Sequence, residues 1–124
     1  MSDPCIPETA AALVRLIHAN RIDLTNEKAA QRQIADLLTA DGWSYQRECR
    51  LSDKDIPDFM MFGGLAVEVK VKGAGKMDVF RQLCRYAEHD RVHGLLLVSG
   101  QSMGLPDTIG GKPAWYASLG RAWL

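Results

Sequence analysis

Apolar residues recur at two different spacings along this chain, and the spacings separate helical from extended segments. Spacings of three and four residues predict helices over residues 9–20, 26–42 and about 77–92. Thr25 or Asn26 suits the N-cap of the second helix. We expect the first helix to lie at the periphery and the other two to belong to the core.

Extended segments fill the interval between the second and third helices. Residues 43–51 alternate loosely and predict a strand. Its in-phase apolar positions are Trp43, Tyr45, Cys49 and Leu51. Residues 56–62 and 65–71 flank a Gly63-Gly64 pair, which indicates a β-hairpin. A fourth strand follows Gly94, where the run LLLV suits a strand that is covered on both faces.

The order helix, three strands, helix, strand predicts an α/β fold with a mixed central sheet flanked by helices. A chain of 124 residues is expected to form a single domain over 1–124. Its core spans about 26–99, with an N-terminal helix and a C-terminal extension. Residues 99–113 are interpreted as a loop. The terminal segment AWYASLGRAWL could be core or an exposed surface, and its element type stays open.

Three charged residues interrupt the apolar hairpin: Asp58, Glu68 and Lys70. Side chains alternate between the two faces of a strand, so Glu68 and Lys70 point the same way. Whether Asp58 joins them depends on the hairpin register, because a slip of one residue moves every side chain to the other face.

Burial decides between the two registers of this hairpin. A two-residue loop would pair Asp58 with Val69 and turn Asp58 toward the core. A three-residue loop, Phe62-Gly63-Gly64, pairs Asp58 with Glu68 and supplies a glycine for a left-handed position. It also gathers one apolar face: Phe59, Met61, Leu65, Val67, Val69 and Val71. We therefore predict the three-residue loop.

Two adjacent carboxylates repel each other and need a cation between them. Lys70 supplies one positive charge, but one ammonium does not satisfy four carboxylate oxygens. Mg²⁺ prefers oxygen ligands and is commonly held by one or two carboxylates with water and phosphate. Asp58, Glu68 and the carbonyl of Val69 are therefore candidate ligands for Mg²⁺ or Mn²⁺.

Composition excludes few classes of function. Fifteen basic residues balance fifteen acidic ones, so bulk charge gives no sign of nucleic-acid or membrane binding. The three scattered cysteines favour a reducing compartment over a disulfide framework. No secretory signal or membrane span is recognisable, and the expected location is the cytoplasm. His18, His89 and His93 lack ligand spacing with a third partner and are expected at the surface.

The motifs Pro57-Asp58 and Glu68-Val69-Lys70 resemble those of the PD-(D/E)xK nuclease superfamily, which has the restriction-endonuclease-like fold. The helix–three strands–helix–strand order is similar to that family's core. QLCRY places Gln82 and Tyr86 one helical turn apart, similar to a motif of RecB-like nucleases. In length and layout the chain also resembles small phage-type VRR-NUC domains. Three cysteines are too few for the four-cysteine iron–sulfur cluster of some RecB-like members.

The resemblance implies a metal-dependent DNA endonuclease in a bacterial or phage-infected cell. Asp58 and Glu68 would bind Mg²⁺ or Mn²⁺, Lys70 would act on the attacking water, and Glu27 would assist from a second shell or at a second metal. Residues expected to bind the DNA are Gln82, Tyr86, Lys72, Lys76, Arg81 and Arg85. Cutting both strands together would need a homodimer, for which the terminal segment is one candidate surface.

A second function class stays open from the sequence. The chain could be a catalytically silent nucleic-acid-binding or assembly module that keeps the nuclease fold. The preference among duplex, flap, junction and single-stranded DNA is not encoded in these motifs.

Overall fold

The computed structural model describes residues 5–73 and 75–124. The helices are α1 (Ile6–His18), α2 (Glu27–Ala40) and α3 (Lys76–Ala87), with a short 3₁₀ helix η1 (Arg121–Trp123) at the end of the chain. The strands are β1 (Tyr45–Arg47), β2 (Phe59–Met61), β3 (Leu65–Lys70), β4 (Gly94–Ser99), β5 (Thr108–Ile109) and β6 (Lys112–Ser118). None of the helices in these two ranges is both long and apolar enough to span a bilayer.

The strands form one six-stranded mixed sheet in the order β1-β2-β3-β4-β6-β5. Strands β1, β2 and β3 pair antiparallel, whereas β4 lies parallel to β3 and β6 lies parallel to β4. Helix α3 connects the parallel strands β3 and β4, as such crossover connections require. The predicted α/β class and mixed sheet are confirmed.

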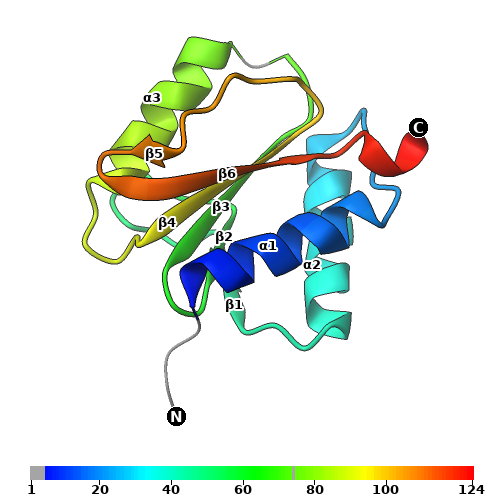
Figure 1. Cartoon of the computed structure of the whole chain (residues 1–124), viewed down its shortest axis with the longest axis horizontal. Coiled ribbons are helices and arrows are strands. Elements are labelled where there is room, and N and C mark those ends of the chain that lie inside the picture. Colours follow the sequence, from blue (N-terminus) through cyan, green and yellow to red (C-terminus); the bar gives the residue numbers. More distant parts are fainter. Residues whose placement is uncertain (1–4, 74) are drawn as a thin grey trace.

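Helices cover the two faces of the sheet from opposite sides, and Figure 1 shows α3 across the strands from α1 and α2. The six hairpin residues expected on one apolar face all pack against α1 and α2. The other face, with Met60, Ala66, Leu95 and Leu97, packs against Val79, Leu83 and Tyr86 of α3. The alternation along β2 and β3 therefore sorts one set of side chains to each helical layer.

The hairpin has the predicted register. Met61 pairs with Leu65 and Phe59 pairs with Val67, so the loop is Phe62-Gly63-Gly64. Gly64 has φ +100°, and the N–H of Gly64 donates to the carbonyl of Met61 at 3.0 Å. A Cβ on Gly64 would lie 2.5 Å from the His93 ring, so the loop needs glycine there for space as well as for conformation.

Strand β1 departs from the predicted alternation over residues 43–51. Trp43 and Tyr45 pack on the α1–α2 side, whereas Cys49 and Leu51 pack on the α3 side. Between them Glu48 has φ +49°, a left-handed conformation that ends the strand and reverses the facing of the chain. The predicted strand is therefore three residues long, and the chain from Cys49 onward crosses toward α3.

Three other expectations about the elements are corrected. Helix α1 is not peripheral, because Ala10, Leu13 and Ile17 are buried in the core against the sheet. Helix α3 ends at Ala87 rather than near residue 92. In the turn that follows, the carbonyl of His89 accepts from the Lys112 ammonium at 2.8 Å.

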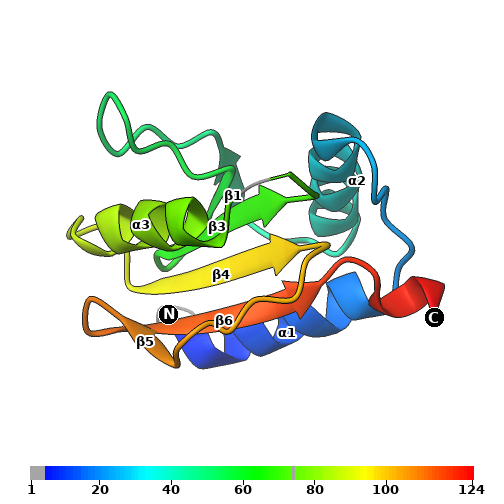
Figure 2. The ribbon, with the colours of Figure 1, turned by 90° about the horizontal axis from the view of Figure 1, so that it is seen from above.

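The third correction concerns residues 99–113, expected to be a loop, because they include β5 and the first two residues of β6. The C-terminal segment, whose element type the sequence leaves open, continues that strand. Residues 112–118 form strand β6 beside β4, and Figure 2 shows β6 lying along β4 with α1 next to it. Ala117 and Leu119 are fully buried, and Trp115 packs against the core. Most of this segment therefore completes the sheet, whereas Trp123 and Leu124 beyond it are exposed.

Candidate functional site

Two carboxylates meet where β2 begins and β3 approaches its end. Asp58 immediately precedes Phe59, whose pairing with Val67 places Asp58 beside Glu68. The Oδ2 atom of Asp58 accepts the N–H of Val69 at 2.7 Å. The Asp58 side chain thus takes the place of a backbone carbonyl of the neighbouring strand as the acceptor for Val69. The bond holds the Asp58 carboxylate against β3. Glu68 is buried and Asp58 is partly buried.

The two carboxylates perturb each other. Burial, followed by the negative charge of Glu68, raises the pKa of Asp58 to about 7. Burial also raises the pKa of Glu68, against the lowering effects of Lys70 and Tyr86. A neighbouring pair of ionised carboxylates is therefore unfavourable here without additional positive charge.

Glu68 is held by one cation and one neutral donor. The Lys70 ammonium lies 3.2 Å from Oε2 of Glu68, and the Tyr86 hydroxyl donates to Oε1 at 2.9 Å. Gln82 in turn donates its amide to the Tyr86 hydroxyl at 2.9 Å. Burial and the Glu68 charge hold the pKa of Tyr86 well above its ordinary value, so the phenol stays protonated and remains a donor.

Tyr86, expected to bind DNA, lies inside the protein. Its side chain is fully buried. Its observed contact is with Glu68, which makes it a positioning residue for that carboxylate. Gln82, expected to bind substrate, is partly buried and contacts both Tyr86 and the adjoining cavity.

Glu27 lies at the same end of the sheet. It is the first residue of α2, where the Asn26 side chain caps the helix by accepting from the N–H of Ala29. Oε1 of Glu27 accepts from the N–H of Val71 at 3.3 Å, just beyond β3. Its negative charge also contributes to the raised pKa of Asp58, which places Glu27 within electrostatic reach of the acid pair.

The oxygen atoms at this site suit a hard cation, but the protein would supply only some of its ligands. Within residues 5–73 and 75–124, no three His, Cys, Asp or Glu side chains are grouped closely enough to hold a metal by themselves. Asp58 and Glu68 supply carboxylate oxygens. The N–H and C=O of one strand residue point toward the same neighbour, so the Val69 carbonyl lies on the Asp58 side of β3. Mg²⁺ tolerates such sites, because water and phosphate complete its octahedron.

A cavity of about 410 Å³ is connected to the acid pair through Lys70, which contacts Glu68, although neither Asp58 nor Glu68 lines it. Its lining residues are Lys70, Gly73, Gly75, Asp78, Val79, Arg81, Gln82 and Arg85. Three of the expected DNA-binding residues, Arg81, Gln82 and Arg85, therefore share a cavity with Lys70. The exposed guanidinium of Arg81 lies 3.5 Å from Asp78, which offsets part of its charge.

The other two expected DNA-binding residues lie elsewhere. Lys72 is exposed and close enough to Asp23 to lower the pKa of that carboxyl. Lys76 lines a separate, largely apolar cavity with Phe80 and Met103. Neither lysine lines the cavity that Lys70 shares with Arg81, Gln82 and Arg85.

Sequence patterns missed Asp55 and His89. Asp55 is buried, with Oδ1 3.0 Å from Arg85 Nε and Oδ2 2.9 Å from His89 Nε2. These partners lower the pKa of Asp55, His89 first and Arg85 after it, so Asp55 is ionised near neutral pH. His89 is thus not a free surface histidine. The DIPD spacing was the available signal, since its two acids lie on either side of an apolar residue and a proline.

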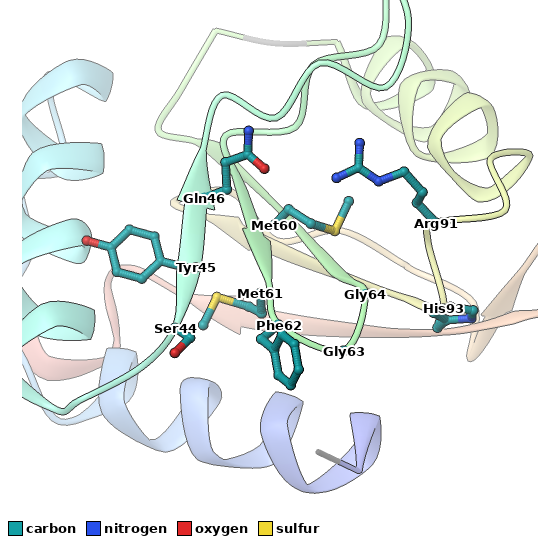
Figure 3. A pocket seen from close by; sticks show the side chains of 10 residues that line it. All are labelled: Ser44, Tyr45, Gln46, Met60, Met61, Phe62, Gly63, Gly64, Arg91 and His93. Carbon is teal, nitrogen blue, oxygen red and sulfur yellow. The ribbon is translucent and has the colours of Figure 1, made fainter. Parts of the chain in front are cut away.

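Another cavity lies away from the acid pair. It measures about 580 Å³ and surrounds the tip of the β2–β3 hairpin. Figure 3 shows Phe62, Arg91 and His93 around this tip, with Gln46 on the neighbouring strand. None of the described residues that line it carries a carboxylate, so they offer no metal ligands of the kind found at Asp58 and Glu68.

Comparisons of the chain with protein-family models, curated proteins and solved structures found no match. The assignment of a function therefore depends on the geometry and electrostatics of the site itself.

Proposed function

We propose that this protein is a metal-dependent DNA endonuclease of the PD-(D/E)xK type. The observation that carries the proposal is the meeting of Asp58 and Glu68 from adjacent strands, with the Lys70 ammonium 3.2 Å from Glu68. The raised pKa values of both carboxyls support it, because perturbed acids concentrate at functional sites. The order α2, β1, β2, β3, α3, β4 is also that of the restriction-endonuclease-like core.

Asp58 and Glu68 would hold Mg²⁺ or Mn²⁺, with the Val69 carbonyl as a further oxygen ligand. When bound, such an ion acidifies water and polarises a phosphoryl oxygen. Lys70 would orient the attacking water and offset the charge that develops on the phosphate. Tyr86 would fix Glu68 through its hydroxyl, and Glu27 would hold water near Asp58. Gln82 and Arg85 would contact the DNA backbone from the cavity, with Arg81 at its edge.

A panel of end-labelled DNA duplexes, flaps, junctions and single strands, incubated with Mg²⁺ or Mn²⁺, tests the proposal. We expect cleavage of at least one substrate, its loss in EDTA, and a drop of at least about a hundredfold in Lys70→Ala or Asp58→Ala. Circular dichroism and thermal melting establish that each variant is folded. No cleavage by the wild type, or full activity in either folded variant, overturns the proposal.

The alternative is a silent nucleic-acid-binding or assembly module with the same fold. The ion pairs Arg81–Asp78 and Arg85–Asp55 favour it to some degree, because they offset positive charge around the cavity. Binding of Mn²⁺ that requires Asp58 and Glu68, without cleavage of any DNA, would select this alternative.

A further inference from the structure

The buried carboxylate of Asp55 belongs neither to the acid pair nor to the sheet. Both its oxygens are engaged by the same helix and the turn after it: Oδ1 by Arg85 and Oδ2 by His89. Both contacts are long-range in sequence and connect the β1–β2 segment to α3. The two partners fix the position of this carboxylate, because losing either one would leave one of its oxygens without a donor.

The backbone around Asp55 is closed into a tight loop. The N–H of Leu51 donates to the carbonyl of Asp55 at 2.9 Å, and the N–H of Asp55 donates to the Ser52 hydroxyl at 3.2 Å. Cys49 is buried against α3 and anchors the start of this loop. His89 is itself tied to β6, since its carbonyl accepts from Lys112 at 2.8 Å. The loop that carries Asp55 and the turn that carries His89 are therefore both anchored to the rest of the fold.

Of the two side chains that hold the Asp55 carboxylate, Arg85 also lines the cavity beside Lys70. It donates to Asp55 through Nε, which leaves its two terminal nitrogens for another acceptor. A guanidinium fixed at Nε keeps its planar fork of terminal N–H groups, and this fork matches two oxygens of one phosphate. Its side chain is 47% exposed, so the fork is accessible from the cavity.

We propose that Asp55, supported by His89, is a positioning residue that turns Arg85 into a phosphate clamp for a DNA phosphate next to the scissile one. The inference rests on the proposed function, because the acid pair defines where cleavage occurs. Lys70 and Gln82 belong both to the acid-pair cluster and to the cavity, so a phosphate held by Arg85 would be adjacent to that cluster. The ligand that Arg85 would bind is a phosphate group of the nucleic-acid backbone.

Equilibrium binding of a fluorescent DNA oligonucleotide in EDTA, measured across a salt series, tests this step without requiring cleavage. Arg85→Gln is expected to weaken binding about tenfold, as for one charge-assisted hydrogen-bonded contact. It should also reduce the slope of log K against log salt by about 0.9 on duplex DNA or about 0.7 on a single strand. Asp55→Asn, which keeps the shape of the side chain, should weaken binding severalfold.

The double variant separates positioning from a general structural effect. If Asp55 acts through Arg85, Asp55→Asn has no additional effect on binding when Arg85 is already Gln. Arg91→Gln is the matched control, since Arg91 is an exposed arginine that lines the other cavity. It should leave the affinity unchanged.

The outcomes distinguish this inference from the proposed function. Wild-type affinity and salt slope in Arg85→Gln, or additive losses in the double variant, overturn the clamp even if the wild type cleaves DNA. Failure of the wild type to bind DNA also overturns it. If the binding tests succeed in a protein that cleaves no DNA, the contact of Arg85 with a DNA phosphate stands, whereas its place next to a scissile phosphate is removed together with the nuclease activity.

Discussion

The Tyr86 hydroxyl donates to Oε1 of Glu68 at 2.9 Å from within the core. This bond connects α3 to β3 and determines the orientation of one of the two proposed metal ligands. The same hydroxyl accepts from the Gln82 amide. Gln82 lines the cavity that Lys70 shares, and it thereby supports the buried Tyr86 from that side.

Tyr86→Phe is therefore expected to weaken Mg²⁺ or Mn²⁺ binding by about ten- to a hundredfold, the usual effect of removing an outer-shell partner. The ring and its packing remain, but one oxygen of Glu68 loses its donor. Isothermal titration with Mn²⁺ measures the affinity directly. Tyr116→Phe is the matched control, because the Tyr116 hydroxyl donates to the backbone carbonyls of Ser99, at the end of β4, and Gln101, just after it. Equal metal affinity in wild type and Tyr86→Phe would contradict the positioning role.

The raised pKa of Asp58 predicts an unusual dependence of stability on pH in the metal-free protein. An acid whose pKa is higher in the folded state binds its proton more tightly there than in the unfolded chain. Its contribution to stability is therefore complete below the ordinary carboxyl pKa of about 4 and is lost as the pH rises through about 7.

Asp58→Asn removes this titration while keeping the size of the side chain. In EDTA, the melting temperature of Asp58→Asn should rise relative to the wild type between pH 5 and pH 8. The expected difference is at least about 4 °C, the change that 1 kcal/mol gives in a domain of this size. Differential scanning calorimetry of both proteins isolates Asp58 from other titrating groups such as His18. Parallel curves would show that Asp58 titrates normally.

Much of the fold followed from the sequence because burial determines the strand faces. The hairpin register was predictable, since only one register collects six apolar residues on one side and uses Gly64 in a left-handed turn. The convergence of Asp58 and Glu68 follows from that register. By contrast, the reversal of facing at Glu48 depends on one backbone angle, which leaves no periodic pattern.

The partners of Asp55 could not be predicted for a different reason, although the DIPD spacing draws attention to Asp55 itself. Asp55 follows the polar turn SDK, where composition indicates solvent exposure. Its partners Arg85 and His89 are 30 and 34 residues away, and only the packing of the loop against α3 brings them together. The structure places Lys72 and Lys76 away from the cavity because the chain turns after β3, which charge counting along the sequence does not capture.

Divalent ions should reverse the pH effect at Asp58. Binding of Mg²⁺ requires deprotonated carboxylates, so the ion competes with protons at this pair. We expect Mg²⁺ to raise the melting temperature of the wild type more at pH 8 than at pH 6, and to leave Asp58→Asn nearly unchanged. The same calorimetric scans with and without the ion measure this. A pH-independent increment, or one retained in Asp58→Asn, would place the bound ion elsewhere.

The hairpin tip offers a test of the register on which the acid pair depends. Gly64→Ala combines φ +100° with a Cβ 2.7 Å from the Arg91 carbonyl and 2.5 Å from the His93 ring. We expect a loss of at least about 3 kcal/mol, since a non-glycine residue in such a conformation alone costs about 1–3 kcal/mol.

Gly73→Ala separates conformation from crowding. Gly73 has φ +80°, but a Cβ added there would have none of the described atoms within 4 Å, so only the backbone cost of about 1–2 kcal/mol is expected. Urea denaturation of both variants gives the comparison. Equal losses in the two would mean that the hairpin tip does not pack against the His93 ring. The pairing of Met61 with Leu65, and with it the placement of Asp58 beside Glu68, would then need revision, because a displaced tip changes which side chains share a face.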